Sequence, residues 1–274
     1  MQSDLLPSTL QRDEVGLWRC NSQAEISYPE GGLAAYLEVE DRSFWCIHRN
    51  ECIIAAMRRL PPSGPVVDLG GGTGYVASGL EQAGFPSLVV EADANGALAA
   101  HERGVEHVIC GPFQEVDFAP GSLPAAGLFD VLEHIADDLG ALRHIHDRLA
   151  PGARLYLTVP AYSLLFSAED RMLGHFRRYN AGSLKRVLVN AGFAVEYTSY
   201  LFMPFPLPIL AVRTVPTWLG GFRHQTPEAS ARAHDVGGSA RLILDRYLRW
   251  EVGVIARGGR LPTGSSCLAV AHKI

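Results

Sequence analysis

From about residue 64 onward, short runs of β-branched and other apolar residues alternate with segments of helix length. This alternation predicts a mostly parallel sheet with helices on both faces, because parallel neighbours need a crossover connection. We therefore predict an α/β fold built on a doubly wound sheet of seven strands. The predicted strands are 65–69, 88–92, 107–110, 128–132, 154–159, 193–200 and 266–272.

The segments outside this pattern are expected to belong to the same domain. A helix is predicted at about 44–60, ahead of the sheet, and an amphipathic helix at about 239–256, before the last strand. Long insertions in compact folds are usually functional, so the second region is expected to be a lid. The predicted organisation is an N-terminal helical roof (1–60), a ligand-binding core (61–202), an insertion or lid (203–263) and the final strand of the core (264–274).

Composition and charge exclude several classes of protein. Hydrophobic residues make up 47% of the chain and charged residues 19%, which excludes a disordered protein. The net charge is -5 and there is no run of Lys or Arg, so no nucleic-acid partner is expected. The five cysteines are odd in number and never spaced Cys-x-x-Cys, which argues against a disulfide framework and a zinc knuckle and fits the cytoplasm.

The N-terminus and the most apolar stretch predict no stable insertion into a membrane. The first 16 residues are polar and acidic, unlike a secretory signal peptide. The most apolar stretch, 200–220, contains four prolines and Arg213, whereas a spanning helix needs about 20 nearly unbroken apolar residues.

The first predicted strand runs into a glycine-rich loop, Asp68-Leu-Gly-Gly-Gly-Thr-Gly74. Gly70, Gly72 and Gly74 let the backbone come close to a ligand, and the helix that follows offers unpaired N–H donors. The loop alone leaves two ligands open, since Gly72-Thr-Gly74-Tyr-Val-Ala77 also fits a dinucleotide fingerprint. The carboxylate of Asp68 suits a ligand with an ammonium group better than a pyrophosphate.

Asp-x-Gly-x-Gly-x-Gly at the end of a first strand resembles the motif of class I S-adenosylmethionine-dependent methyltransferases. The segments Phe129-Asp-Val-Leu-Glu-His134 and Leu149-Ala-Pro-Gly-Ala-Arg-Leu-Tyr-Leu157 are similar to the family's fourth-strand and fifth-strand motifs. The resemblance covers about residues 64–200. It implies a Rossmann-like fold and S-adenosyl-L-methionine as cofactor, released as S-adenosyl-L-homocysteine.

The resemblance also implies which residues hold this cofactor. An acid at the end of the second strand holds the ribose hydroxyls in this family, and we favour Asp93, with Glu91 as the alternative. An acid there can instead simply cap the following helix. Many relatives have Gly-Asp after the third strand, but here Pro112 follows Gly111, so the adenine contacts are expected from Phe113 and Gln114. The full predicted set is Asp68, Gly70, Gly72, Gly74, Glu91, Asp93, Phe113, Gln114 and Asp130.

Candidates for acceptor chemistry follow the fourth and fifth strands. The imidazole of His134 can accept a proton near neutral pH, although Glu133 and His134 can instead organise the loop around the cofactor. The pattern Ser167…Asp170…Gly174-His-Phe-Arg-Arg-Tyr179 resembles one branch of bacterial small-molecule methyltransferases, in which this loop faces the acceptor. His175, Asp170 and Tyr179 are therefore also catalytic candidates. Alternatively, Arg177 and Arg178 pair with the acids of this loop and hold it in place.

No metal site is predicted, since His144 and His146 lie two residues apart on a helix and point in different directions. Aromatic residues gather in the two flanking regions, and the stretch Phe202 to Trp218 is expected to be an irregular, mobile lid whose prolines prevent a continuous helix. A contact of this stretch with a membrane surface is the alternative.

Together these patterns predict a cytoplasmic methyltransferase that acts on a small, rather apolar or aromatic metabolite by in-line methyl transfer. The expected partner is that small-molecule acceptor, and a homo-oligomer is left open. Two alternatives remain at this point, a nicotinamide-dependent oxidoreductase and a non-catalytic binding protein with the same fold.

Overall fold

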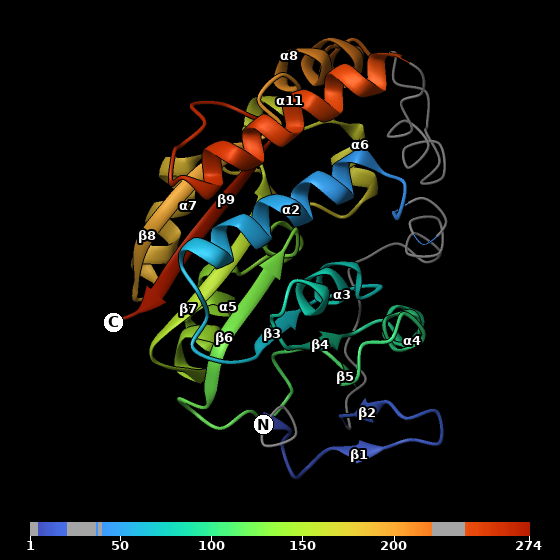
Figure 1. Ribbon diagram of the computed structural model, residues 1–274, viewed down its shortest axis with the longest axis vertical. Coiled ribbons are helices and arrows are strands. Elements are labelled where there is room, and N and C mark those ends of the chain that lie inside the picture. The colour runs from blue at the N-terminus through green and yellow to red at the C-terminus, as the bar shows by residue number, and fades with distance from the viewer. Residues whose placement is uncertain (1–4, 21–36, 38–39, 221–238) are drawn as a thin grey trace.

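A computed structural model of the protein describes residues 5–20, 37, 40–220 and 239–274. Parts of the predicted roof (1–4, 21–36 and 38–39) and of the predicted insertion (221–238) lie outside the described residues. The described chain forms one sheet in the order β1-β2-β5-β4-β3-β6-β7-β9-β8 (Figure 1). The strands are β1 (Gln11–Arg12), β2 (Trp18–Arg19), β3 (Val66–Leu69), β4 (Ser87–Glu91), β5 (Val108–Cys110), β6 (Leu123–Phe129), β7 (Leu149–Pro160), β8 (Phe193–Leu201) and β9 (Ser266–Lys273).

The predicted class of fold is confirmed, but the strand count is wrong. β2 through β7 pair in parallel, whereas β9 runs antiparallel to both β7 and β8. The predicted seven strands are all present, and β1 and β2 extend the sheet beside β5. Two-residue strands leave no periodicity in a sequence, so the pattern could not reveal them. Residues 11–12 and 18–19 therefore belong to the sheet.

Two strand boundaries also differ from the prediction. β6 begins at Leu123 rather than 128, and β7 begins at Leu149 rather than 154. After Leu123, the added residues of β6 are one Pro, two Ala and one Gly, which have low β propensity, yet most of this strand is buried. Burial between the two helical layers outweighs propensity here.

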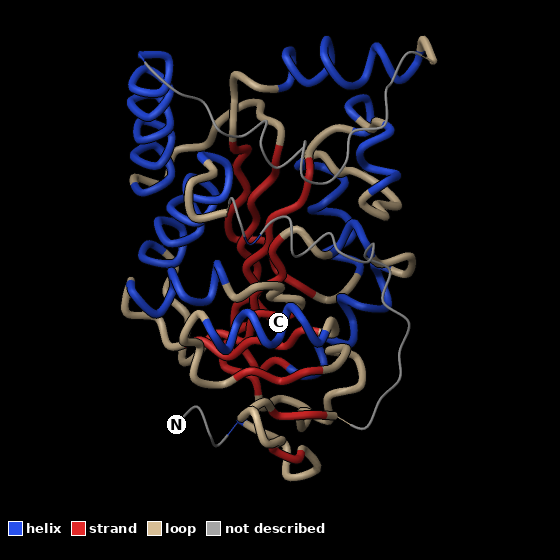
Figure 2. Tube along the Cα trace, turned by 90° about the vertical axis from the view of Figure 1, so that its right-hand side faces the viewer, coloured by secondary structure: helices blue, strands red, loops and turns tan. Residues whose placement is uncertain are grey.

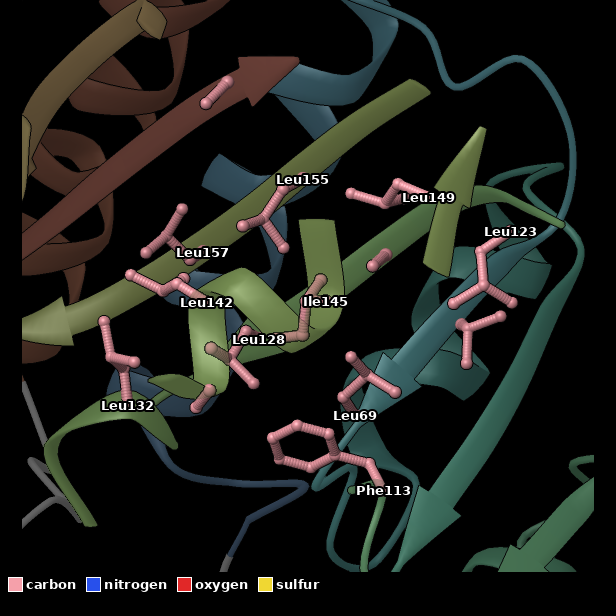
Figure 3. Close-up of a cluster of buried hydrophobic side chains, with 14 of the residues drawn as sticks. Leu69, Phe113, Leu123, Leu128, Leu132, Leu142, Ile145, Leu149, Leu155 and Leu157 are labelled. Carbon is pink, nitrogen blue, oxygen red and sulfur yellow. The ribbon is translucent and has the colours of Figure 1, made fainter. Parts of the chain in front are cut away.

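Helices cover both faces of the sheet, as the view along its edge in Figure 2 shows. The face that carries Val66 packs against α2 and α11, and the face that carries Val67 packs against α5 and α7. Figure 3 shows the core on the second face, where Leu142 and Ile145 of α5 meet Leu155 and Leu157 of β7. The helices are α2 (Phe44–Arg59), α3 (Tyr75–Gln82), α4 (Ala94–Glu102), η2 (Leu132–His134), α5 (Asp138–Arg148), η3 (Ser163–Leu165), α6 (Ala168–Met172), α7 (Ala181–Asn190), α8 (Pro206–Ile209), η4 (Leu210–Thr214), α9 (Val215–Trp218) and α11 (Ser239–Ala256).

The segment predicted to be irregular is helical. α8, η4 and α9 follow one another without a break, with a π-helical turn at η4 between two short α-helical turns. Pro206 and Pro216 each lie at the start of an α-helical turn, where the missing N–H costs little. Among the described helices, none has both the length and the apolar character needed to cross a bilayer.

The order of the strands opens a crevice at one end of the sheet. From β3 the chain proceeds outward through β4 and β5 on one side, and through β6 and β7 on the other. The loops after β3 and β6 therefore leave in opposite directions, and ligands of doubly wound sheets bind at such a switch point, beyond the carboxyl ends of the strands.

Candidate active site

A cavity of about 650 Å³ lies at this crevice. Its walls come from the loops after β3, β4, β5, β6 and β7, from α2, and from the segment 209–213. Most of the predicted site residues line it: Asp68, Gly70, Gly72, Glu91, Asp93, Phe113, Gln114, Asp130, His134, Asp170 and His175. The exceptions are Gly74 and Tyr179.

The glycine-rich loop turns beneath this cavity. Gly70 and Gly72 have φ angles of +75° and +55°, a region that favours glycine. A Cβ on Gly70 would lie 2.8 Å from the side chain of Val131, so close packing also requires glycine there. Gly74 does not line the cavity and instead allows two helices to pack closely. It begins α3 and packs on α4, where its Cβ would lie 2.8 Å from the Cβ of Ala100.

Asp68, one residue before the end of β3, has a buried carboxylate beside this loop. Neither of its oxygens has a hydrogen-bond partner among the described residues. Burial raises the pKa of Asp68 to about 7, the guanidinium of Arg49 opposes this shift, and Glu91 adds to it. A buried carboxylate with unused acceptors fits a cationic ligand.

The two acids after β4 have different surroundings. The Asp93 side chain caps α4, since its Oδ1 accepts hydrogen bonds from the backbone N–H of Asn95 and Gly96. Glu91 lies at the strand end and accepts from the backbone N–H of Gly72 at 2.7 Å and of Asp93 at 2.8 Å. Burial raises the pKa of Glu91, and those two hydrogen bonds oppose the rise. Glu91 thus joins the glycine-rich loop to the next strand, whereas Asp93 organises a helix.

Phe113 and Gln114 differ in exposure. Phe113 is buried and packs in the core between the sheet and α5, as well as lining the cavity (Figure 3). Gln114 is exposed at the rim of the cavity.

Arg49 of α2 reaches over the switch point and pairs with Asp130, which follows β6. Asp130 has a φ angle of +55°, unusual for a residue other than glycine. Burial opposes the charge of Arg49, but Asp130 outweighs this effect and raises the pKa of the guanidinium. Arg49 was not among the predicted site residues, because nothing local in its sequence brings it near Asp68 and Asp130.

Glu133, His134 and His175, which come from the loops after β6 and β7, meet in the wall of the cavity. The rings of His134 and His175 are perpendicular, with centroids 4.6 Å apart. Their nitrogens and the Glu133 carboxylate lie within 4.8 Å of one another. Burial, reinforced by His175, lowers the pKa of His134 to about 4, so this imidazole is neutral at pH 7. Burial raises the pKa of Glu133 well above its ordinary value, and Asp130 adds to the rise.

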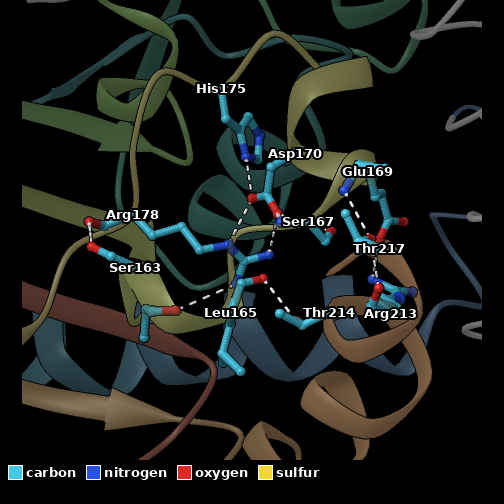
Figure 4. A network of polar contacts seen from close by, with 12 residues as sticks. Ser163, Leu165, Ser167, Glu169, Asp170, His175, Arg178, Arg213, Thr214 and Thr217 are labelled. Atoms are coloured by element: carbon cyan, nitrogen blue, oxygen red, sulfur yellow. Dashed lines mark hydrogen bonds and ion pairs between the residues drawn. The ribbon is translucent and has the colours of Figure 1, made fainter. Parts of the chain in front are cut away.

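Asp170 holds His175 in position (Figure 4). Its Oδ1 lies 2.9 Å from Nδ1 of His175, and Nε and Nη2 of Arg178 donate to its two oxygens at 2.6 and 3.0 Å. Burial opposes ionisation of Asp170, but the hydrogen bond from His175 and the charge of Arg178 outweigh it and hold the pKa below its usual range. Because an ionised carboxylate can only accept, Nδ1 of His175 donates this hydrogen bond.

Tyr179 does not lie in the cavity, so the prediction of a catalytic role for it is not supported. Its buried hydroxyl donates to Asp138 at 2.7 Å, and its ring belongs to the core on the α5 face. Two side chains of the same loop therefore lie in different places: His175 lines the cavity, and Tyr179 packs in the core.

The segment α8–η4–α9 lies against α6 at the edge of the cavity. Ile209 and Arg213 line the cavity, and Arg213 pairs with Glu169. The backbone N–H of Ala168 donates to Thr217 at 3.3 Å, and the Thr214 hydroxyl donates to the carbonyl of Leu165 (Figure 4).

A family model described as a methyltransferase domain matches residues 43–198. A protein of Mycolicibacterium smegmatis named a probable S-adenosylmethionine-dependent methyltransferase is 26% identical over 170 residues, which cover 59% of this chain and 64% of that protein. The matched region thus spans less than two thirds of the length of that curated relative.

Two solved structures share the fold. Phosphoethanolamine N-methyltransferase 2 of Haemonchus contortus, in complex with S-adenosyl-L-methionine, has a TM-score of 0.56 and 18% identity over 91% of this chain and 58% of that one. A SAM-dependent methyltransferase of Archaeoglobus fulgidus has a TM-score of 0.51 and 14% identity over 82% and 94% of the two chains.

Proposed function

Because the chain belongs to the methyltransferase domain family, we propose that it transfers a methyl group from S-adenosylmethionine to a small, rather apolar acceptor. One observation carries this proposal: a single cavity joins the glycine-rich loop, Asp68 and Glu91 to the cluster of Glu133, His134 and His175. Donor and acceptor bound in one cavity meet the geometric need of an in-line transfer. The match to methyltransferases leaves the nicotinamide-dependent alternative without support.

The half of the cavity around β3 and β4 fits the donor. Asp68 is proposed to accept from the donor's ammonium group, and Gly70 and Gly72 to let its methionine part approach the backbone. The observation behind this assignment is that both Asp68 oxygens are buried without a hydrogen-bond partner among the described residues.

For the ribose, the surroundings favour Glu91 over Asp93, which reverses the order of preference from sequence. Both acids line the cavity and each accepts two backbone hydrogen bonds, but Glu91 is buried at the end of β4 and bonds to the glycine-rich loop, whereas Asp93 caps α4. The exposed Gln114 at the rim and the ring of Phe113 are proposed to contact the adenine.

The other half of the cavity is proposed to hold the acceptor. Its lining combines the polar cluster of Glu133, His134 and His175 with apolar side chains, namely Ile135, Leu173, Phe176 and Ile209. In the transfer, the bond between the donor's sulfur and its methyl carbon breaks as the bond to the acceptor forms. The sulfonium becomes a neutral thioether, so the protein mainly has to align the two molecules and exclude water.

The test has two stages. Calorimetry with S-adenosylhomocysteine and S-adenosylmethionine should show binding, while NAD should give no thermal stabilisation. A panel of small molecules incubated with donor labelled in its methyl group should then identify an acceptor. Absence of donor binding would contradict the proposed function, and donor binding without transfer to any molecule would favour a non-catalytic binding protein.

The two histidines provide the sharper comparison. His134→Ala and His175→Ala should lose turnover while keeping donor affinity, because both side chains come from the loops after β6 and β7, whereas Asp68 and Glu91 lie on β3 and β4. A lost proton-transfer group typically lowers the rate by about 100- to 10,000-fold. Joint loss of donor affinity and turnover would instead make them structural supports of the cavity.

A further inference from the structure

We propose that Glu133, His134 and His175 bind a divalent transition-metal ion, which in turn binds a hydroxyl group of the acceptor. This inference rests on the proposed function and specifies its acceptor class. It differs from the sequence-based expectation of no metal site, which considered the cysteine spacing and the pair His144 and His146.

The geometry of the cluster suits one ion. Its carboxylate oxygen and imidazole nitrogens lie within 4.8 Å of one another. Ligand atoms that each lie about 2.0–2.2 Å from a shared zinc ion must approach one another within about 4.4 Å, so small side-chain rotations close the site. The cluster joins two loops, and their backbones are already connected, since the N–H of Phe176 donates to the carbonyl of Glu133 at 2.8 Å.

His175 is already oriented as a metal ligand. Its Nδ1 lies 2.9 Å from Oδ1 of Asp170, which leaves Nε2 for the cluster. Metal-binding histidines almost always donate their second ring N–H to a carboxylate, a carbonyl or water, and this contact fixes the tautomer. Arg178 holds Asp170 from the other side, so the carboxylate cannot easily turn away.

Glu133 supplies an independent observation that points to a cation. Its side chain is 1% exposed, and its Oε2 has no hydrogen-bond partner among the described residues. The charges of Arg49 and Arg178 act on Glu133, but these residues form their ion pairs with Asp130 and Asp170. A buried carboxylate without an ion-pair partner of its own is costly, and a metal ion would reduce that cost.

The donor set selects among metals. Two imidazoles and one carboxylate suit Zn²⁺, Mn²⁺ or Fe²⁺, whereas Mg²⁺ prefers oxygen ligands. Three protein ligands leave coordination positions open for a substrate. An acceptor hydroxyl bound there would release its proton to solvent water, because a bound cation lowers the pKa of a coordinated O–H group. The resulting oxygen anion would form the new O–CH₃ bond as the S–CH₃ bond breaks.

Metal binding by the full chain tests this directly. After dialysis against a chelator, the wild type should bind one Zn²⁺ or Mn²⁺ per chain by calorimetry and elemental analysis, and Mg²⁺ far more weakly. Glu133→Gln and His175→Ala should lose this site. Asp170→Asn should weaken binding by about 10- to 100-fold, as expected for a partner that only orients a ligand. The control is His107→Gln, which should leave metal binding unchanged. His107 does not line the cavity, and its imidazole lies 4.0 Å from the exposed carboxylate of Glu106.

A second readout uses the folded wild type alone. Co²⁺ in the site should change its visible absorption when S-adenosylhomocysteine and a hydroxylated acceptor are added together. Unchanged metal binding in Glu133→Gln and His175→Ala, or no Zn²⁺ or Mn²⁺ binding by the wild type, would overturn the metal site. If methyl transfer continues unchanged in chelator, the metal inference fails and the proposed function stands. If the donor does not bind at all, the proposed function itself fails.

Discussion

Asp68, in the half of the cavity proposed to hold the donor, has a carboxylate without a hydrogen-bond partner among the described residues. Both oxygens are buried and lack hydrogen-bond partners among the described residues, and Arg49, whose charge acts on Asp68, pairs with Asp130 instead. Glu91, by contrast, accepts two backbone hydrogen bonds. At the scale of single residues, charge and hydrogen bonding therefore assign different roles to acids that look alike in the sequence.

Donor binding should depend on pH through Asp68. Its pKa in the free protein is about 7, and a bound ammonium group favours the ionised form. Below pH 7 the carboxyl must release a proton to bind the donor, so affinity should fall by up to about tenfold per pH unit as the pH is lowered. Calorimetry with S-adenosylhomocysteine from pH 5 to 8 measures this slope. Asp68→Asn should bind more weakly and lose this part of the pH dependence, and a parallel slope in wild type and variant would contradict the assignment.

The assignment of the ribose contact to Glu91 predicts unequal effects of two isosteric changes. Glu91→Gln should weaken donor binding strongly, because it removes charged hydrogen bonds worth about 1.5–3 kcal/mol each. Asp93→Asn should change donor affinity little, since asparagine also caps helices well. Titration of both variants with S-adenosylhomocysteine shows which of the two acids contacts the ribose. A larger loss for Asp93→Asn would restore the order first expected from the sequence.

At the scale of elements, α8, η4 and α9 form a wall of the cavity that is tied to its neighbouring loops. Leu207, Val212, Trp218 and Leu219 are exposed on this segment, while Thr214 is fully buried against η3. The polar contacts described above join it to the region of η3 and α6. The expectation that this segment is a mobile lid stays a prediction, now for a helical segment.

The lid predicts a pattern of limited proteolysis. Chymotrypsin should cut between residues 202 and 219 in the free protein, and S-adenosylhomocysteine with an acceptor should slow this cleavage. Arg213→Ala should increase the rate, because it removes the ion pair with Glu169. The control is Arg241→Ala, which removes an ion pair within α11. Equal cleavage with and without ligands, together with co-sedimentation on lipid vesicles, would favour a membrane-surface contact instead.

At the scale of the whole molecule, one buried acid connects the N-terminal region, the end of β8 and the last helix. Glu251 of α11 lies 2.9 Å from Nε2 of His48 of α2 and accepts from the backbone N–H of Phe202 and Met203. The ring of Trp45 stacks on Phe202 with centroids 3.7 Å apart. These contacts fix α2 over the sheet, and α2 carries Arg49 to the switch point.

Loss of this connection should lower the stability of the entire fold. Glu251→Ala leaves a buried histidine and two backbone amides without their acceptor, and breaking a buried pair typically costs about 3–5 kcal/mol. The matched control on the same helix is Asp245→Ala, whose partly exposed pair with Arg241 is worth about 0.3–0.5 kcal/mol. Denaturant unfolding measures both. A similar small loss for the two variants would show that Glu251 does not hold the elements together.

The sequence alone determined the features that depend on local pattern. The glycine-rich loop, the alternation of strands and helices and the strand-end acids follow from positions near one another in the chain, so the class of fold, the family and the cofactor could be predicted from them. Helix α11 was predicted at 239–256, where the structure has it, because amphipathic periodicity is also local.

Only the tertiary structure decided which distant side chains meet. Arg49 and Asp130 are 81 residues apart, and His48 and Glu251 are 203 apart, so no local pattern could pair them. The same holds for Glu133, His134 and His175, which lie on two loops that the sheet brings to one edge. Tyr179 shows the converse, since a residue only four positions from His175 turns into the core. Periodicity reports the face of an element, whereas the contacts of a site depend on how separate elements pack.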